Sequence, residues 1–301
     1  MANVKWVGGY SGATTDASNV NNWSTASLPT TSDNVYIEAN PSGTDYSIEA
    51  GLTALQGVAL ASLNIGQNYT GNIGTTSSYF LTAATLINVG YQYGGTSTAS
   101  GSSLIRLNNG TVNATTTIYN TAASGTMANG PFQFLGTHSS NTLNVLSGIV
   151  SVAADPTESA TIATLNTGGT VTLGTGVTIT TANVYNGALT LRSAITTITQ
   201  TGGNVVTAGT GAITTFNLRG GSANFTSTGT ITTLNIQSAT ADFSQDPRAK
   251  TVTNCTMYAG GTLNVNNGVK GSITFSNNVI VTASPGNFTL TAWPNTTFAL
   301  S

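Results

Sequence analysis

From residue 142 onward the chain repeats one pattern of apolar and polar positions. Seven segments each hold two short alternating stretches that meet at a corner rich in Gly, Asn or Ser: TLNVLSGIVSV, TLNTGGTVTL, TANVYNGALTL, TITQTGGNVV, TFNLRGGSANF, TLNIQSATADF and NCTMYAGGTLNV. The first inward residues of these segments are Leu143, Leu165, Ala182, Ile198, Phe216, Leu234 and Cys255, which lie 16 to 22 residues apart. Repetition at this interval predicts a solenoid.

The spacing fits one coil of a parallel β-helix. Alternation with a period of two places one set of side chains inside each coil, and neighbouring coils stack through main-chain hydrogen bonds at about 4.8 Å. The residues predicted inside two of the coils are Val184, Leu189, Leu191, Leu218, Ala223 and Phe225. Because β-branched residues dominate and no apolar period of 3.6 residues occurs, we expect very little helix. The predicted fold is all-β, a single-stranded right-handed parallel β-helix with an N-terminal cap.

The repeat is looser before residue 142, and this divides the chain. We predict a capping segment over residues 1–50, irregular first coils over 51–141, regular coils over 142–287, and a C-terminal strand and tail over 288–301. A solenoid end exposes unpaired strand edges and an open core, so it needs a cap.

Aromatic and apolar residues gather at the two chain ends. Trp6 and Trp23 either plug the first coil or dock on a partner, and plugging is at least as well supported. Trp293, Phe298 and Leu300 form either a second plug or a tail that docks on a neighbour. Docking is favoured for the tail because the Asn- and Thr-rich stretch after residue 294 has little core to fill.

Four coils open with Ile-Thr-Thr, at residues 179, 195, 213 and 231. Stacking in register predicts an inner column of isoleucines flanked by threonine hydroxyls, which stabilises the solenoid through contacts between neighbouring strands. The alternative is a flat threonine face that orders water, as in ice-binding solenoids. Two expectations oppose it: adjacent threonines point to opposite faces, and the coil length varies.

Charged residues make up only 5% of the chain, with seven Lys and Arg and a net charge of −2. Seven basic residues are too few for the many phosphate contacts that nucleic-acid binding needs, and the sequence has no basic cluster that would bind an anionic membrane. The single cysteine excludes a disulfide framework. The N-terminus shows no secretory signal, and no apolar run is long enough to span a bilayer, so we expect synthesis in a cytoplasm.

Side chains that could perform catalysis are scarce. After residue 50 the acids are Asp155, Glu158, Asp242 and Asp246. Glycoside cleavage needs two carboxylates that face one bond, whereas the Asp-Pro pairs at 155 and 246 are typical of turns. No tryptophan lies between Trp23 and Trp293, which argues against a long aromatic sugar groove. We therefore predict no enzyme activity and no catalytic residues.

The remaining candidates also favour structural roles. His138 is the sole histidine, so a histidine triad or a zinc site cannot be assembled, and we predict that it lies in a loop or corner. Cys255 occupies an inward position and is interpreted as a small buried apolar residue. The acids of the N-terminal segment are spread along the chain, so we predict no metal and no cofactor.

Several segments carry a resemblance to known proteins. WVGGYSG and NNWSTASLPTTSDNVYI, residues 21–37, resemble a capping segment that precedes β-helical repeats in bacterial surface proteins and in structural proteins of tailed phages. LASLNIGQNYTGNIGTTSSYFL, and then FQFLGTHSSNTLNVLSGIVSVA over residues 132–153, are similar to stretches of uncharacterised phage virion proteins. Together these segments cover roughly half of the chain.

The resemblance implies a virion role. Surface adhesins with this repeat usually carry a secretion signal and a membrane barrel, and we expect neither in this chain. This favours a phage capsid decoration, or cement, protein made in the host cytoplasm and bound to the capsid surface. Its implied partners are the major capsid protein and itself, as a homo-oligomer that analogy suggests is a trimer, with no nucleic acid and no membrane. The alternatives are a tail fibre, spike or other receptor-binding adhesin, and a polysaccharide depolymerase on a β-helix scaffold.

Overall fold

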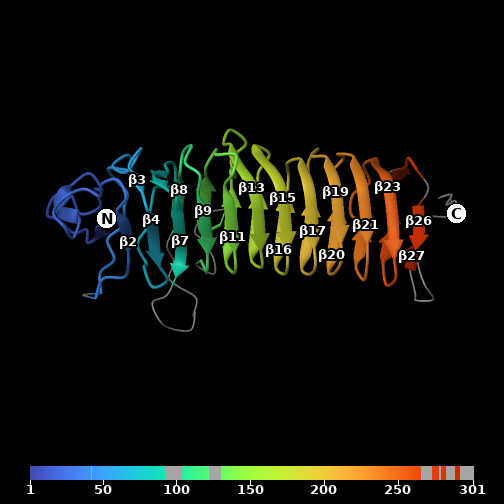
Figure 1. Ribbon diagram of the computed structural model, residues 1–301, viewed down its shortest axis with the longest axis horizontal. Coiled ribbons are helices and arrows are strands. Elements are labelled where there is room, and N and C mark those ends of the chain that lie inside the picture. The colour runs from blue at the N-terminus through green and yellow to red at the C-terminus, as the bar shows by residue number, and fades with distance from the viewer. Residues whose placement is uncertain are drawn as a thin grey trace. The chain divides into compact units, whose positions relative to one another are not determined.

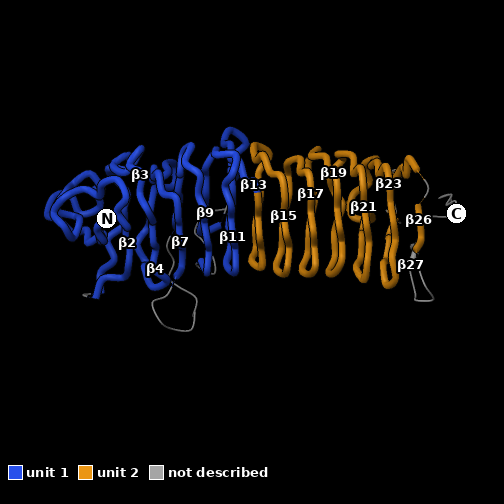
Figure 2. Tube along the Cα trace, in the orientation of Figure 1, with its two compact units in different colours: residues 1–163 blue, residues 164–301 orange. Residues whose placement is uncertain are grey.

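The chain forms strands almost throughout. The structure, a computed structural model, describes residues 1–41, 43–91, 104–121, 130–265, 273–277, 279–282 and 289–291. Within these ranges it contains 27 strands and one 3-10 helix, η1 (Val20–Asn22). Figure 1 labels many of the strands. The chain divides into two compact units, residues 1–163 and 164–301, which Figure 2 colours separately. The strand β13 (Ala160–Thr167) includes the boundary between them.

Unit 1 contains two parallel sheets and one additional strand pair. Its first sheet follows the order β1 (Asn3–Lys5), β2 (Asn34–Ile37), β4 (Ser62–Gly66), β7 (Leu86–Tyr91), β9 (Thr115–Ile118) and β11 (Thr142–Val145). Its second sheet follows the order β5 (Phe80–Leu81), β8 (Ile105–Asn108), β10 (Phe132–Leu135) and β12 (Ile149–Val152). The additional pair joins β3 (Ala59–Leu60) to β6 (Ala83–Ala84).

Unit 2 is built in the same way with more regular coils. Its first sheet follows the order β15 (Val177–Val184), β17 (Ile195–Gln200), β19 (Ile213–Leu218), β21 (Ile231–Ile236), β23 (Lys250–Tyr258) and β25 (Ile273–Phe275), and β26 (Val279–Thr282) also pairs with β23. Its second sheet follows the order β14 (Thr170–Leu173), β16 (Ala188–Leu191), β18 (Asn204–Thr207), β20 (Ser222–Phe225), β22 (Thr240–Asp242), β24 (Thr262–Asn264) and β27 (Thr289–Thr291).

From β7 to β25 successive strands alternate between a first and a second sheet, so one strand from each sheet makes a coil. The predicted register is confirmed, because Ala182 pairs with Ile198, Ile198 with Phe216, Phe216 with Leu234, and Leu234 with Cys255. These pairs are parallel, and the all-β parallel β-helix predicted from the repeat is thereby confirmed. Its right-handed sense stays a prediction from the general rule for parallel crossovers.

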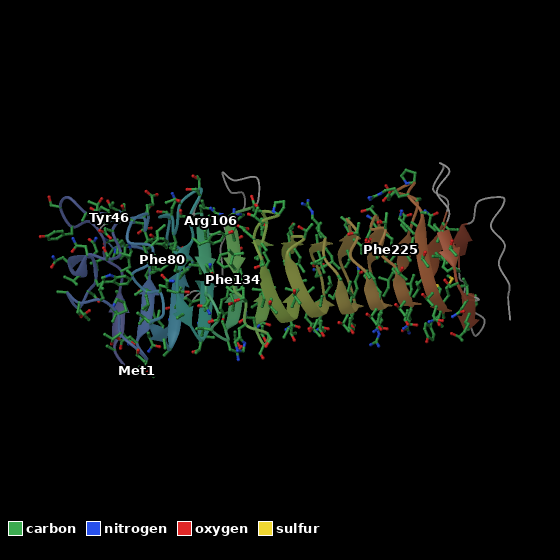
Figure 3. The ribbon with its side chains drawn as sticks, turned by 90° about the horizontal axis from the view of Figure 1, so that it is seen from above. Met1, Tyr46, Phe80, Arg106, Phe134 and Phe225 are labelled. Atoms are coloured by element: carbon green, nitrogen blue, oxygen red, sulfur yellow. The ribbon has the colours of Figure 1, made fainter. Side chains whose placement is uncertain are left out.

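The predicted inner residues form the core. All of them are at most 2% exposed: Leu143, Leu165, Ala182, Val184, Leu189, Leu191, Ile198, Phe216, Leu218, Ala223, Phe225, Leu234 and Cys255. The Phe225 ring stacks on Phe243 with centroids 4.4 Å apart and meets Phe216 edge to face at 5.4 Å. Figure 3 labels Phe225 in unit 2, and Phe80 and Phe134, which are also buried, in unit 1.

Glycine is required at the corner that leads from the first sheet to the second. Gly203 has a φ of +70°, and a Cβ atom there would collide with the carbonyl oxygen of Gly187 one coil earlier. Close stacking of the corners therefore excludes any side chain at this position. This explains why the corner segments of the repeat are rich in glycine.

The predicted capping segment contributes strands to the first sheet of unit 1. Within residues 1–50, β1 pairs with β2, and β2 pairs with β4. Asp33 fixes this start, because its carboxylate accepts hydrogen bonds from the backbone N–H groups of Ala2 at 2.7 Å and Thr30 at 2.9 Å. These two bonds lower the pKa of Asp33. The division of the structure falls at residue 163, and the boundaries at residues 50, 141 and 287 stay predictions.

Candidate functional site

The two N-terminal tryptophans are buried. Trp6 is 5% exposed and Trp23 is 2% exposed, and their rings meet edge to face with centroids 5.2 Å apart. The indole N–H of Trp6 donates to the carbonyl of Tyr46, and that of Trp23 donates to the carbonyl of Ala17, both at 2.8 Å. Because both rings are enclosed and both N–H groups are bonded, the structure supports the plugging interpretation for this pair.

The other three predicted docking residues, Trp293, Phe298 and Leu300, lie outside the described residues. Their docking role stays a prediction.

Cys255 and His138 occupy the predicted places. Cys255 is 1% exposed, and burial raises the pKa of its thiol to about 12. His138 lies between strands β10 and β11, where its Nδ1 accepts a hydrogen bond from the backbone of Ser140 at 3.1 Å. The prediction of a buried apolar role for the cysteine and a corner position for the histidine is confirmed.

The acids of the first Asp-Pro segment lie in a turn between β12 and β13. The Asp155 carboxylate accepts hydrogen bonds from the backbone and hydroxyl of Thr157, which confirms the predicted turn. Glu158 pairs with the Arg106 guanidinium at 3.3 Å and accepts the Tyr79 hydroxyl at 2.6 Å. Burial and this hydrogen bond raise the pKa of Tyr79 to about 12.

Arg106, labelled in Figure 3, links this turn to the second sheet of unit 1. Its side chain is 9% exposed, and its guanidinium carbon lies 4.0 Å from the centre of the Tyr79 ring. An ion pair combined with a cation–π contact holds the turn against β8. The sequence reasoning missed this cluster because its members are 27 to 79 residues apart.

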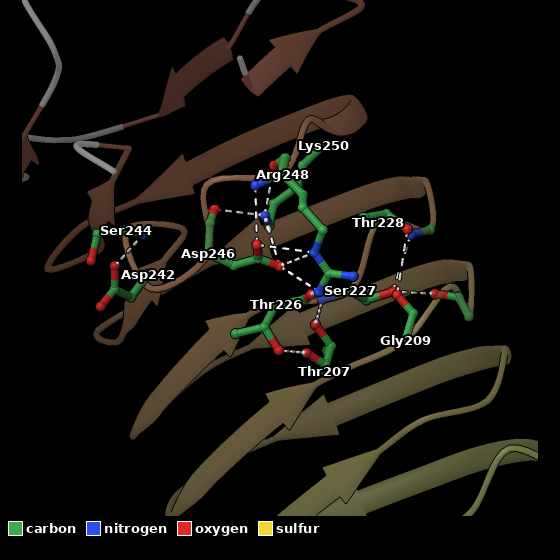
Figure 4. A network of polar contacts seen from close by, with 12 residues as sticks. Thr207, Gly209, Thr226, Ser227, Thr228, Asp242, Ser244, Asp246, Arg248 and Lys250 are labelled. Carbon is green, nitrogen blue, oxygen red and sulfur yellow. Dashed lines mark hydrogen bonds and ion pairs between the residues drawn. The ribbon is translucent and has the colours of Figure 1, made fainter. Parts of the chain in front are cut away.

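The second Asp-Pro segment forms a charged clamp in unit 2, shown in Figure 4. The Arg248 side chain donates to both carboxylate oxygens of Asp246, and its Nη2 also donates to the carbonyl of Thr226 at 2.6 Å. Lys250, whose side chain is 2% exposed, donates from Nζ to the carbonyls of Asp246 and Arg248. The hydrogen bonds from Arg248 lower the pKa of Asp246 to about 2. This arrangement ties a turn to the preceding coil.

The threonine pairs depart from the predicted alternation. In β17 both Ile195 and Ile198 are buried, whereas Thr196 is exposed and Thr197 is half-buried. The expectation that adjacent threonines point to opposite faces is therefore wrong. Ile195 and Thr197 both have register partners on the neighbouring strands, whereas Thr196 between them has none. Period-two alternation is therefore interrupted at the first threonine, and both threonines lie outside. The predicted inner column of isoleucines is confirmed, since Ile179, Ile195, Ile213 and Ile231 are at most 5% exposed.

Two rows of outward side chains follow the threonines on the first sheet of unit 2. We call the less exposed of the two rows the amide row. It contains half-buried residues from successive strands: Asn166, Asn183, Thr199, Asn217, Asn235 and Thr256. Asn183 donates to Asn166 at 2.9 Å, and Asn235 donates to Asn217 at 2.9 Å. Identical side chains at one register position thus bond along the stack.

The second row, the tyrosine row, is exposed where each strand ends: Tyr185, Thr201, Arg219, Gln237, Tyr258 and Thr282. Tyr185 is 58% exposed and Tyr258 is 40% exposed. Large aromatic side chains on the surface at a repeated position are candidates for binding, because a phenol offers both an apolar ring and a hydrogen-bonding group.

A groove of about 200 Å³ lies between the amide row and the tyrosine row. It is lined by Asn217, Arg219, Asn235, Gln237 and Tyr258. We call it the Arg219 groove. Its lining is polar, with amide, guanidinium and phenol groups, and it is the candidate site of unit 2.

Unit 1 has a larger groove on its own first sheet. Its volume is about 520 Å³, and its lining includes Lys5, Tyr36, Glu38 and Tyr91. Glu38 accepts hydrogen bonds from the Lys5 ammonium at 3.0 Å and from the Tyr91 hydroxyl at 3.1 Å. The carboxylate is therefore neutralised within the groove by its own neighbours.

The described ranges contain no group of three or more His, Cys, Asp or Glu side chains arranged to hold a metal ion. Among the same residues, no helix is long and apolar enough to cross a membrane. The candidate sites rest on the lining of the two polar grooves. Comparison with known proteins gives no match: no family model, no curated protein and no solved structure matches the chain.

The sequence reasoning missed both grooves. No tryptophan lies between Trp23 and Trp293 to indicate a sugar platform, whereas the exposed rings of the tyrosine row are phenols. The signal was present in the repeat, since Tyr185, Arg219 and Tyr258 each follow the second inward residue of their segments, Val184, Leu218 and Met257.

Proposed function

We propose that the chain is a non-enzymatic structural protein of a phage virion, a decoration protein that binds the major capsid protein on the outside of the head. The resemblance of residues 132–153 to phage virion proteins supports a location in the virion, and residues 21–37 resemble a capping segment found in phage structural proteins and in bacterial surface proteins. A trimeric homo-oligomer rests on analogy with other decoration proteins. In this proposal the chain is made in the host cytoplasm and acts without cofactor, nucleic acid or membrane.

The proposal that the protein is not an enzyme rests on the hydrogen bonds and ion pairs of the four carboxylates that follow residue 50. Asp155 and Asp246 each accept hydrogen bonds within their own turns, and Glu158 is paired with Arg106. Asp242 accepts hydrogen bonds from Ser244 at 2.8 Å and from other neighbours. Carboxylates held in this way stabilise turns, whereas acid–base catalysis needs carboxylates aimed at a substrate.

The small number of charged residues suits a structural protein whose contacts use few ion pairs. With 5% charged residues, contacts to a capsid or to a second copy must use main-chain groups, amides and apolar anchors rather than many ion pairs. Binding of this kind should depend only weakly on salt concentration.

The location of the chain on the particle tests the proposal. Antibody raised against the purified protein and carried on gold should label phage heads, and reconstruction of the particle should show its density at regular lattice positions. Absence of label and density from purified particles would contradict a virion role.

A second candidate, a receptor-binding fibre or spike, is favoured by the exposed tyrosine row. Label confined to the tail tip, together with inhibition of infection by the free protein, would support this candidate against decoration.

Incubation with host surface polysaccharides separates both roles from a depolymerase. We expect no new reducing ends and no unsaturated sugars. Release of fragments that Asp155→Ala or Asp242→Ala abolishes would establish the enzyme alternative instead.

A further inference from the structure

The Arg219 groove offers a set of polar groups that sugar hydroxyls can use. The bond between Asn235 and Asn217 uses Nδ2 of the first and Oδ1 of the second. The Asn235 amide oxygen and the two N–H donors of Asn217 take no part in this bond, and both residues line the groove beside the Gln237 amide. Paired donors and acceptors on half-buried side chains are suited to a ligand rich in hydroxyl groups.

The Tyr258 ring supplies the apolar part of the site. The residue is 40% exposed and lines the same groove as Arg219. A phenol presents a flat apolar face and a hydroxyl, so it can pack against the carbon face of a sugar ring and also bond to it.

Charge complementarity indicates an acidic ligand. Arg219 is exposed, and its guanidinium forms no ion pair within the described residues. The acids of the described part of unit 2, Asp242 and Asp246, have partners of their own around the turn that precedes β23. A guanidinium recognises a carboxylate through two parallel hydrogen bonds, and neither of these two carboxylates pairs with Arg219.

The stacking of the coils indicates a polymer rather than a single sugar. The amide row and the tyrosine row repeat once per strand, at about 4.8 Å, a step comparable to the length of a pyranose ring. Polar and aromatic side chains continue along both rows from the groove to Tyr185, which is 58% exposed. A linear chain can therefore contact equivalent positions on successive coils.

We propose that the first sheet of unit 2 binds a strand of acidic polysaccharide along the amide row and the tyrosine row. A uronate carboxylate pairs with Arg219, and a neighbouring sugar ring packs on Tyr258. One cation is too few for nucleic acid, whose affinity depends on several phosphate contacts. This binding goes beyond the proposed structural function and does not depend on where the protein sits on a particle.

Affinity electrophoresis in gels that contain polygalacturonate, with dextran as the neutral polymer, tests the proposal. We expect polygalacturonate to retard the full-length protein, and dextran and single-stranded DNA to leave it unretarded. Arg219→Gln and Tyr258→Ala should each weaken binding about tenfold, the loss expected for one charge-assisted contact or one stacked ring.

Two matched variants control the experiment. Arg192→Gln removes another exposed arginine, which follows β16 outside both rows, and Tyr10→Ala removes a tyrosine that is 48% exposed in unit 1. Both should bind as the unmodified chain does, and all four variants should keep its β-type circular dichroism spectrum. Lack of retardation by polygalacturonate, equal retardation by dextran or DNA, or an equal loss in Arg192→Gln would overturn the proposal.

Discussion

The side-chain amide of Asn235 donates a hydrogen bond of 2.9 Å to the side-chain oxygen of Asn217 on the neighbouring strand. The two residues are register partners in β21 and β19, and both point outward. The same bond joins Asn183 to Asn166. Stacked amides therefore reinforce the main-chain ladder, and they do so only when neighbouring coils are in the correct register.

Asn235→Ala should lower the free energy of unfolding by about 1 kcal/mol, the usual contribution of one net hydrogen bond. Urea titration followed by circular dichroism measures the change. Asn186→Ala, at an exposed corner of the same unit, is the matched control and should leave the midpoint unchanged. Equal effects of the two variants would show that the amide bond contributes nothing.

The inner positions and the register were predictable because apolar residues alternate with polar ones and the segments repeat. The prediction for the Ile-Thr-Thr openings failed in part: strict alternation puts one threonine inside, whereas Ile195 and Ile198 are both buried and Thr196 and Thr197 lie outside. The interruption lies at the second residue of β17, and a rule of strict alternation does not anticipate it.

The candidate grooves were not predicted, for a different reason. Arg219 and Tyr258 are 39 residues apart in the sequence, and only the stacking of β19, β21 and β23 brings their positions together. A binding surface made of one residue per coil becomes visible when the segments are aligned by their outward positions as well as by their inward ones.

Phe225→Ala should destabilise unit 2 by about 3–5 kcal/mol, because it removes a ring that is 1% exposed and packed against Phe216 and Phe243. Thermal and urea unfolding measure the loss. Tyr185→Ala removes a ring of similar size that is 58% exposed and should change stability little. If Phe225→Ala unfolds no more easily than Tyr185→Ala, the aromatic stack does not support the coils.

Cys255 should be unreactive toward iodoacetamide at pH 8 in the folded protein. Its thiol is 1% exposed, and burial raises its pKa to about 12, so the reactive thiolate is scarce and inaccessible. Mass spectrometry of the intact chain should show no adduct under native conditions and one adduct in urea. Modification of the native chain as fast as that of the unfolded chain would contradict the buried position.

Asp246→Asn should destabilise the protein at pH 7 by about 3 kcal/mol, because it leaves the buried Lys250 charge without the carboxylate that lies 3.4 Å away. Asp242→Asn is the matched control. The Asp242 carboxylate accepts hydrogen bonds from the neutral groups of Ser244 and Asn264, so Asp242→Asn should destabilise the protein less than Asp246→Asn does.

The same substitution should change the dependence of stability on pH. The bonds from Arg248 lower the folded-state pKa of Asp246 to about 2, below the ordinary value of 3.8. Because the pKa is lower in the folded state than in the unfolded state, the carboxylate contributes its full stabilisation at pH values above the ordinary pKa of 3.8. This contribution disappears as the pH falls from about 4 to about 2. Melting temperatures between pH 5 and pH 2 should therefore fall more steeply for the unmodified protein than for Asp246→Asn. Parallel curves would show that the clamp around Asp246 is not linked to proton binding.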